Sequence, residues 1–228
     1  GFNESEFEQA VDKIKDSQKI KLVSIYSHLA ASEDLNEKKF TKMQINLFKK
    51  IASTIKSKIS EKPMLHMSNT SGILNYDECE FDMVRSGIGL YGYNNELDKN
   101  LKPVHKLKSI ISQIIIAEKG DSIGYNRKFI CDAKTKIGVI PIGHADGISR
   151  SFSKNGYVFI KGIKTKVIGN ICMDVFMVNL NGMDVKEGDE IVVFDTKNNA
   201  ESFASSVGTI SYEILTNLSS RIERKFIL

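Results

Sequence analysis

The feature that most constrains the fold is a change in hydrophobic pattern at the polar stretch 94–103, NNELDKNLKP. Before it, apolar residues at helical spacing alternate with short apolar runs, and the stretch 35–59 has the pattern of a long amphipathic helix. After it, β-branched runs follow one another, separated by Gly, Asn or Asp. Because such a change marks a boundary, we predict two domains, residues 1–98 and 99–228.

The first domain is predicted to be part of an α/β fold. Helices are expected over residues 2–14 and 35–59, and strands over 20–27, 63–68 and 81–86. Short buried strands that alternate with helices are typical of a parallel sheet built from βα units. A closed (β/α)₈ barrel takes eight strands and about 250 residues, so three strands would leave an open edge. We therefore expect a fragment of a barrel rather than an edge that a partner covers.

The second domain is predicted to be mainly β, either a barrel or a sandwich. Its strands are expected within six runs, KLKSIISQIIIAE, KIGVIPIG, GYVFIKG, IKTKVIGN, CMDVFMVNL and DEIVVFD. The last stretch, VGTISYEILTNLSSRIERKF, is predicted to form a helix followed by a final strand.

Composition restricts the classes of function. The net charge of +4 comes from 32 basic and 28 acidic residues spread along the chain, so no nucleic-acid partner is expected. The three cysteines lack Cys-x-x-Cys spacing, which argues against a disulfide framework or a zinc site. No apolar run reaches the ~20 residues of a membrane span, and the acidic start does not resemble a signal peptide. We expect a cytoplasmic protein without membrane contact.

Two patterns that resemble ligand motifs fail in their context. Gly87, Gly89 and Gly92 match G-x-G-x-x-G, but the chain continues into YNNELDKNLKP, which cannot form the helix that a dinucleotide site needs. We therefore reject a dinucleotide site. The four histidines are scattered without the spacing of metal ligands, so no metal is expected.

Polar residues follow the predicted strands of the first domain. His28 follows IYS, and Arg85 ends DMVRS. Asn69 and Thr70 follow LHMS. In α/β barrels, catalytic groups gather at this end of the strands, and the last loops often bind phosphate. Asn69 and Thr70 offer side-chain donors, and the stretch 86–88 offers backbone N–H groups. The alternative is that these polar residues only cap the helices that follow.

Seven stretches of sequence carry a resemblance to a known family. They are SIYSHLAASED, HMSNTSGIL, FDMVRSGIGLYGY, GDSIGYNRKF, VIPIGHADGISR, VIGNICMDVFMVNL and TISYEILTNLSSRIERKF. In order and spacing they are similar to alanine racemase, over nearly the whole chain. The resemblance is to the C-terminal part, which is the end of a TIM-like (β/α)₈ barrel followed by a mainly β domain. It implies an isomerase that interconverts L-alanine and D-alanine with pyridoxal 5′-phosphate for peptidoglycan synthesis, as a homodimer with shared active sites.

The resemblance also implies roles for single residues. Tyr125, in SIGYNRKF, matches the catalytic tyrosine that exchanges the α-proton on the L-alanine side, supported by His28 and Arg85. Arg85 matches the arginine that faces the pyridine nitrogen, and a guanidinium disfavours protonation there because it only donates hydrogen bonds. Met173 and Asp174, in CMDVF, match the substrate-side loop of the partner subunit. The residues implied to bind the cofactor are His28, Asn69, Thr70, Arg85, Gly87, Ile88 and Tyr212.

The residues themselves leave other interpretations open. Tyr125 can be a tyrosine at the rim of a barrel, and Met173 can be a core residue. Arg85 can form an ion pair with Asp82 or Glu80. For the whole protein, the alternatives are a non-catalytic dimerisation or protein-binding module, and a racemase of another small amino acid such as serine.

The sequence departs from the family pattern at three positions. No lysine matches the lysine that forms the Schiff base with the cofactor, which the family carries on its first barrel strand, and the arginine for the substrate carboxylate has no match either. We therefore expect the 228-residue chain by itself to be inactive. His144 stands where the family usually has tyrosine in a GYADG motif, near the entrance of the site.

Overall fold

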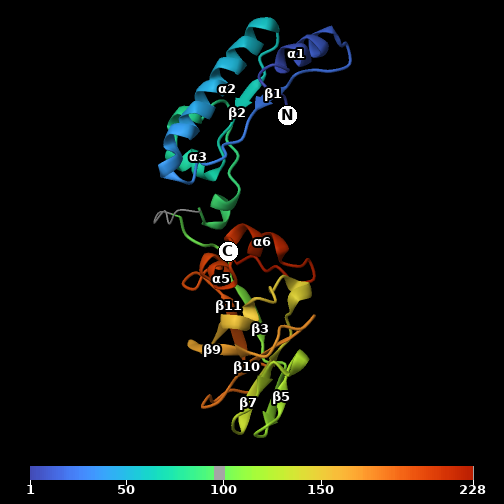
Figure 1. Cartoon of the computed structure of the whole chain (residues 1–228), viewed down its shortest axis with the longest axis vertical. Helices are drawn as coiled ribbons and strands as arrows, with labels where there is room; N and C mark the ends of the chain where they lie inside the picture. The colour runs from blue at the N-terminus through green and yellow to red at the C-terminus, as the bar shows by residue number, and fades with distance from the viewer. Residues whose placement is uncertain (95–100, 228) are drawn as a thin grey trace. The chain divides into compact units, whose positions relative to one another are not determined.

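The chain consists of two compact units, Gly1–Leu101 and Lys102–Leu228 (Figure 1). The computed structural model describes residues 1–94 and 101–227. The predicted boundary between residues 98 and 99 lies outside the described residues. Within the described part of the chain, no helix is both long enough and apolar enough to cross a membrane.

The first unit combines helices with a small parallel sheet. Its elements, with η for a 3-10 helix, are α1 (Phe7–Asp16), β1 (Ser24–Tyr26), η1 (Leu35–Glu37), α2 (Lys38–Lys58), β2 (Met64–His66), α3 (Thr70–Asn75), η2 (Asp77–Cys79) and η3 (Ile88–Tyr91). β1 and β2 pair in parallel, with Tyr26 opposite His66. The parallel pairing confirms the expectation of βα units in this half.

The prediction of a full third strand over residues 81–86 is wrong. The stretch forms a single parallel bridge between His66 and Met83. Beside that bridge, Asp82 donates its N–H to the carbonyl of Leu65 at 2.9 Å, and its carboxylate accepts the N–H of Leu65 at 2.7 Å. A side chain therefore takes the place that a backbone carbonyl would have in a longer ladder.

The long helix predicted over residues 35–59 is confirmed by η1 and α2. Its buried residues recur at intervals of three or four and form one stripe, which consists of Thr41, Ile45, Phe48, Ala52 and Ile55. The stripe lies over β1 and β2 (Figure 1), and its residues Ile45, Phe48 and Ala52 pack with Leu65 and Met67 in one core cluster. Ile55 packs with Phe7 and Val11 of α1 in another. Tyr26 and Met64 remain exposed. The sheet thus buries one face and leaves side chains of the other face accessible.

The second unit is built on a seven-stranded antiparallel sheet. Its elements are β3 (Leu107–Ile110), β4 (Gln113–Ala117), β5 (Ser122–Ile123), η4 (Tyr125–Arg127), β6 (Phe129–Ile130), β7 (Thr135–Ile140), η5 (His144–Asp146), α4 (Phe152–Asn155), β8 (Tyr157–Ile160), β9 (Ile163–Ile168), β10 (Phe176–Asn179), β11 (Glu190–Phe194), α5 (Ala200–Val207) and α6 (Ser211–Asn217). The strand order is β3-β11-β8-β9-β10-β7-β4. Only Ile111 and Ser112 separate β3 from β4, so the sheet curls until its two ends meet in one bent strand. The curl agrees with the predicted barrel rather than the sandwich.

The final strand predicted after α6 is wrong. Among the described residues 218–227, none belongs to a helix or strand. The guanidinium of Arg224 donates instead to the carbonyls of Leu218, Ser219 and Ile222 at 3.1 to 3.2 Å. These bonds curl the chain locally, so its backbone cannot extend along the sheet.

Two connections of the second unit touch through their backbones. One follows β7, and the other joins β9 to β10. The N–H of His144 donates to the carbonyl of Cys172, and the N–H of Ala145 donates to the carbonyl of Met173, both at 3.0 Å. Gly143 lies at this contact, where a Cβ would come within 2.4 Å of the Met173 carbonyl oxygen. Only a residue without a side chain permits this approach.

We predict that Gly143→Ala lowers the free energy of unfolding by about 3 kcal/mol, the upper part of the range for overpacking, because the new Cβ meets backbone that cannot move away. Urea unfolding followed by circular dichroism measures the change. Gly138→Ala is the control, since its Cβ would meet the flexible side chains of Leu180 and Val178 at 2.9 and 3.1 Å. Equal losses for the two variants would contradict the prediction.

Candidate active site

Arg85 is the centre of a polar cluster at the C-terminal ends of β1 and β2. Its Nη1 donates to Nδ1 of His66 at 2.5 Å. Its Nη2 donates to the carbonyl of Ser27 at 2.9 Å, to Nδ1 of His28 at 3.1 Å and to the carbonyl of Met67 at 3.4 Å. The guanidinium therefore joins residues that are up to 58 positions apart in the sequence.

The proposed ion pair of Arg85 with Asp82 or Glu80 is wrong. Within the described residues, neither carboxylate forms a salt bridge with the guanidinium. Asp82 is instead occupied by the backbone N–H of Leu65. Among the described residues of this unit, the positive charge of Arg85 thus has no acidic partner.

The contacts of Arg85 assign the protonation of two histidines. A guanidinium carries donors only, so a ring nitrogen that faces it must accept. The Nδ1 atoms of His28 and His66 are therefore unprotonated, and in the neutral rings each Nε2 carries the proton. Consequently His28 presents an Nε2–H donor on the side away from Arg85.

His66 and Tyr26 belong to this cluster, although sequence reasoning did not select them. Their rings stack with centroids 5.1 Å apart and planes at 3°, and the Tyr26 ring centroid lies 5.5 Å from the Arg85 guanidinium carbon. Burial first, and the charge of Arg85 second, lower the pKa of His66. The available signal was that two predicted strands each end in an aromatic ring, Tyr26 and His66, which the parallel pairing places opposite one another.

Asn69 begins α3 as its N-cap. Its Oδ1 accepts the N–H of Gly72 and the hydroxyl of Ser32, each at 2.9 Å. The capping role that the sequence left open for Asn69 is therefore confirmed. Its carbonyl-type oxygen is used inside the fold rather than directed at a ligand.

Thr70 connects α3 to the loop before η3. Its Oγ1 accepts the N–H groups of Gly87 at 3.2 Å and Gly89 at 3.1 Å, which leaves its own O–H available as a donor. Among the described residues, the N–H of Ile88 has no acceptor. A Cβ on Gly87 would meet no atom within 4 Å, so open space adjoins these donors. The arrangement suits an anion.

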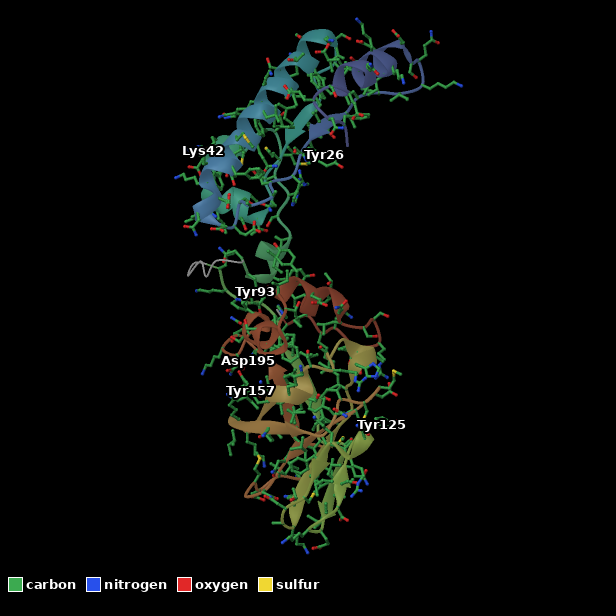
Figure 2. All side chains as sticks on the ribbon, viewed as in Figure 1. Tyr26, Lys42, Tyr93, Tyr125, Tyr157 and Asp195 are labelled. Carbon is green, nitrogen blue, oxygen red and sulfur yellow. The ribbon has the colours of Figure 1, made fainter. Side chains whose placement is uncertain are left out.

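Tyr125 lies at the surface of the second unit, with 72% of its surface exposed (Figure 2). Its backbone is nevertheless held, because Asn170 Nδ2 donates to the Tyr125 carbonyl at 2.9 Å. The next two residues, Asn126 and Arg127, have φ of 58° and 50°, in the left-handed region that non-glycine residues rarely adopt. Strain of this kind is common at functional sites.

Met173 and Asp174 occupy the tip of the connection between β9 and β10. The N–H of Cys172 donates to the carbonyl of Val175 at 2.9 Å, which closes the turn. Met173 is 55% exposed, so its interpretation as a core residue is wrong. Asp174 lies 3.3 Å from the guanidinium of Arg221.

Tyr212 and His144 lie near a hollow in the second unit. The hollow has a volume of about 440 Å³, and its lining includes His144, Ser149, Thr209 and Glu213. Tyr212 is partly buried on α6, next to the lining residue Glu213. In the described part of the chain, no three His, Cys, Asp or Glu side chains gather as a metal ion would require.

The structure distributes the predicted residues over the two units. In the first unit, His28 and Arg85 share a hydrogen bond, and Thr70 bonds to Gly87 next to Ile88. Asn69 also belongs to the first unit, whereas Tyr125, Met173, Asp174 and Tyr212 belong to the second.

Comparison with known families gives a match over both units. Residues 1–95 match the family model described as "Alanine racemase, N-terminal domain", and residues 104–226 match "Alanine racemase, C-terminal domain". The chain therefore carries sequence of both domains, not of the C-terminal one alone.

Similar proteins include an alanine racemase of Cutibacterium acnes, which is 34% identical over 98% of this chain and 61% of its own length. Among solved structures, alanine racemase of Clostridium difficile 630 in complex with cycloserine has a TM-score of 0.87 and 33% identity, over 96% of this chain and 60% of that one. The enzyme of Bartonella henselae with covalently bound pyridoxal phosphate has a TM-score of 0.85 and 29% identity, over 100% and 63%. The chain spans about three fifths of the length of these relatives.

We predict that Arg85→Met raises the pKa of His66, because a nearby positive charge that opposes protonation is removed. Titration of the His66 ring proton by NMR measures the shift. Arg85→Lys is the control: it retains the charge, so the pKa of His66 is expected to stay closer to its wild-type value. A pKa that does not rise in Arg85→Met would contradict the described contact.

Proposed function

The chain belongs to the alanine racemase family, and we propose that the complete protein interconverts L-alanine and D-alanine with pyridoxal 5′-phosphate as its cofactor. The observation that carries the proposal is the cluster of Arg85, His28 and His66 beside the open N–H of Ile88. D-alanine for peptidoglycan is the product that we assign. The free cysteines fit a reducing cytoplasm as the place of the reaction.

The residues of the first unit fit the cofactor in two respects. The free N–H of Ile88, the O–H of Thr70 and the open space beside Gly87 suit its phosphate. Among the described residues, Nε of Arg85 has no acceptor, so it can face a ring nitrogen. As a donor only, Arg85 would keep that nitrogen unprotonated. When bound, the cofactor supplies an electron sink for the carbon that loses its proton.

Tyr125 is the residue that we assign to move the α-proton on the L-alanine side, at its Oη atom. A phenol in water loses its proton near pH 10, so a phenol that acts near neutral pH needs a donor or a cation beside it. The Nε2–H of His28 is suited to this role because Arg85 occupies its Nδ1. Arg85 therefore acts on Tyr125 through His28. The Nε2–H of His28 donates a hydrogen bond to Oη of Tyr125, so the two atoms share that proton.

The two groups of residues suggest how subunits combine. We propose a homodimer in which the second unit of one subunit supplies Tyr125, Met173 and Asp174 to the first unit of its partner. The exposure of Tyr125 and Met173 supports this, because both side chains are accessible to another surface. The open face of the small sheet, with Tyr26 and Met64, is accessible too.

Two measurements separate this proposal from its alternatives. No lysine of this chain is assigned to form the Schiff base with the cofactor. Both measurements therefore use the complete protein. A Schiff-base absorbance band, distinct from that of the free cofactor, after addition of pyridoxal phosphate supports the enzyme. Its absence favours a non-catalytic dimerisation or protein-binding module. Turnover of L-serine faster than that of L-alanine would favour a racemase of another amino acid.

We predict that Tyr125→Phe lowers the racemisation rate by about 10²–10⁴-fold, the usual contribution of a general acid or base. In deuterated water, the variant should lose exchange of the α-proton of L-alanine while it keeps exchange from D-alanine, because only one face loses its base. Tyr157→Phe is the control, since Tyr157 packs against Phe159 and Lys164, neither of which is an assigned residue. Wild-type turnover by Tyr125→Phe would refute the role.

We further predict that a mixture of the inactive variants Tyr125→Phe and Arg85→Ala regains about a quarter of the wild-type activity after exchange of subunits. If each site combines two subunits, half of the dimers are mixed, and each mixed dimer holds one site without either change. Assay before and after exchange measures the gain. An activity that stays at the level of the separate variants would show that each site lies within one subunit.

A further inference from the structure

Asp146 is a buried carboxylate held by three donors. Only 2% of its surface is exposed. One oxygen, Oδ1, accepts a hydrogen bond from Nε of Arg221, and Oδ2 accepts one from Nη2 of Arg221 at 2.7 Å. Oδ2 also accepts the N–H of Gly143 at 2.8 Å. The guanidinium of Arg221 therefore binds the carboxylate of Asp146 through two parallel hydrogen bonds. This bidentate geometry is the strong one for such a pair.

Arg221 also reaches the turn that carries Met173 and Asp174. Its Nη2 lies 3.3 Å from Oδ1 of Asp174, so one guanidinium bridges two carboxylates. The N–H of Ser219 donates to the carbonyl of Asp146 at 3.2 Å, which ties the segment after α6 to the same loop. Three segments that are distant in the sequence thus meet at Arg221.

The loop around Asp146 also contacts that turn directly, through backbone hydrogen bonds. The N–H groups of His144 and Ala145 donate to the carbonyls of Cys172 and Met173, and Gly143 lies so close to them that no Cβ fits. The position of the turn therefore depends on the 143–146 loop, and the position of that loop depends on its buried carboxylate.

Electrostatics explain why this arrangement is stable. An isolated buried carboxylate is costly, so Asp146 needs its partners to stay charged. The hydrogen bond from Arg221, followed by that from Gly143, lowers the pKa of Asp146. Arg221 itself is half exposed, and the side chain of a free arginine would occupy many rotamers. The pair thus orders an arginine that would otherwise be mobile next to Asp174.

We propose that Asp146 and Arg221 are positioning residues that hold the Met173–Asp174 turn in place as the substrate-side wall of the active site. The catalytic part of this inference rests on the proposed function, in which that turn faces the substrate. Neither residue needs to touch the substrate, because both act through the backbone and carboxylate of the turn.

The test compares three variants of the complete protein, Asp146→Asn, Arg221→Gln and Arg221→Lys, with the control Asp189→Asn. Asp189 is also a partly buried carboxylate with a basic partner, Lys161 at 3.0 Å, but it contacts neither loop. Hydrogen–deuterium exchange reports on the N–H groups of His144 and Ala145. The KM and kcat for L-alanine report on the wall of the site.

We expect Arg221→Gln to speed exchange at these two N–H groups about tenfold, since their bonds open more often. Its KM should rise about 10-fold to 100-fold with a smaller change in kcat, because a displaced turn loses binding contacts. Arg221→Lys should recover part of both, whereas Asp189→Asn should change neither. Asp146→Asn should resemble Arg221→Gln.

Unchanged exchange and unchanged KM in Arg221→Gln would overturn the inference, and so would a loss of kcat alone that Arg221→Lys does not restore. If Asp146→Asn does not fold, the two Arg221 variants test the inference by themselves. They alter a half-exposed side chain rather than a core position. A wild-type protein that neither binds pyridoxal phosphate nor racemises alanine would refute the proposed function instead. In that case the exchange experiment still tests whether Arg221 positions the turn.

Discussion

A guanidinium can only donate hydrogen bonds, and the first unit is organised around that restriction. Arg85 donates to two ring nitrogens and two carbonyls at the ends of β1 and β2. Both histidines must therefore accept at Nδ1, and His28 must present its remaining N–H outward. The cluster contains no acid to neutralise the charge among its described contacts, so the cation stays available for a ligand or for a neighbouring acid–base group.

In the second unit, the candidate residues are positioned by backbone hydrogen bonds rather than by one central side chain. Its curled sheet supplies a rigid frame, and the functional candidates lie on connections that are fixed by backbone contacts. Asn170 holds the carbonyl of Tyr125, and the loop at Gly143 holds the carbonyls of the Met173 turn. Side chains at such positions can be exposed and still be well placed, because hydrogen bonds hold their backbones. This is how an exposed tyrosine can serve a site that another surface completes.

The sequence predicted those elements in which a hydrophobic pattern continues over many residues without interruption. The stripe of α2 and the β-branched runs of the second unit gave the correct type of structure, although β1 covers only three of the eight residues expected. The stretch 81–86 and the end of the chain failed because side chains, Asp82 and Arg224, replaced ladder hydrogen bonds. Short helices such as α5 were not predicted, since eight residues carry too few periodic positions to distinguish them from a loop.

The sequence by itself determined the two-part organisation, the resemblance to one family and the identity of the strand-end residues, because each of these depends on neighbours along the chain. Only the tertiary structure decided that His66 and Tyr26 join Arg85, that Asn69 caps a helix, and that Asp146 meets Arg221 across 75 positions. These contacts depend on which strands pair and how a sheet curls. That outcome follows from packing over the whole unit, which no local pattern encodes.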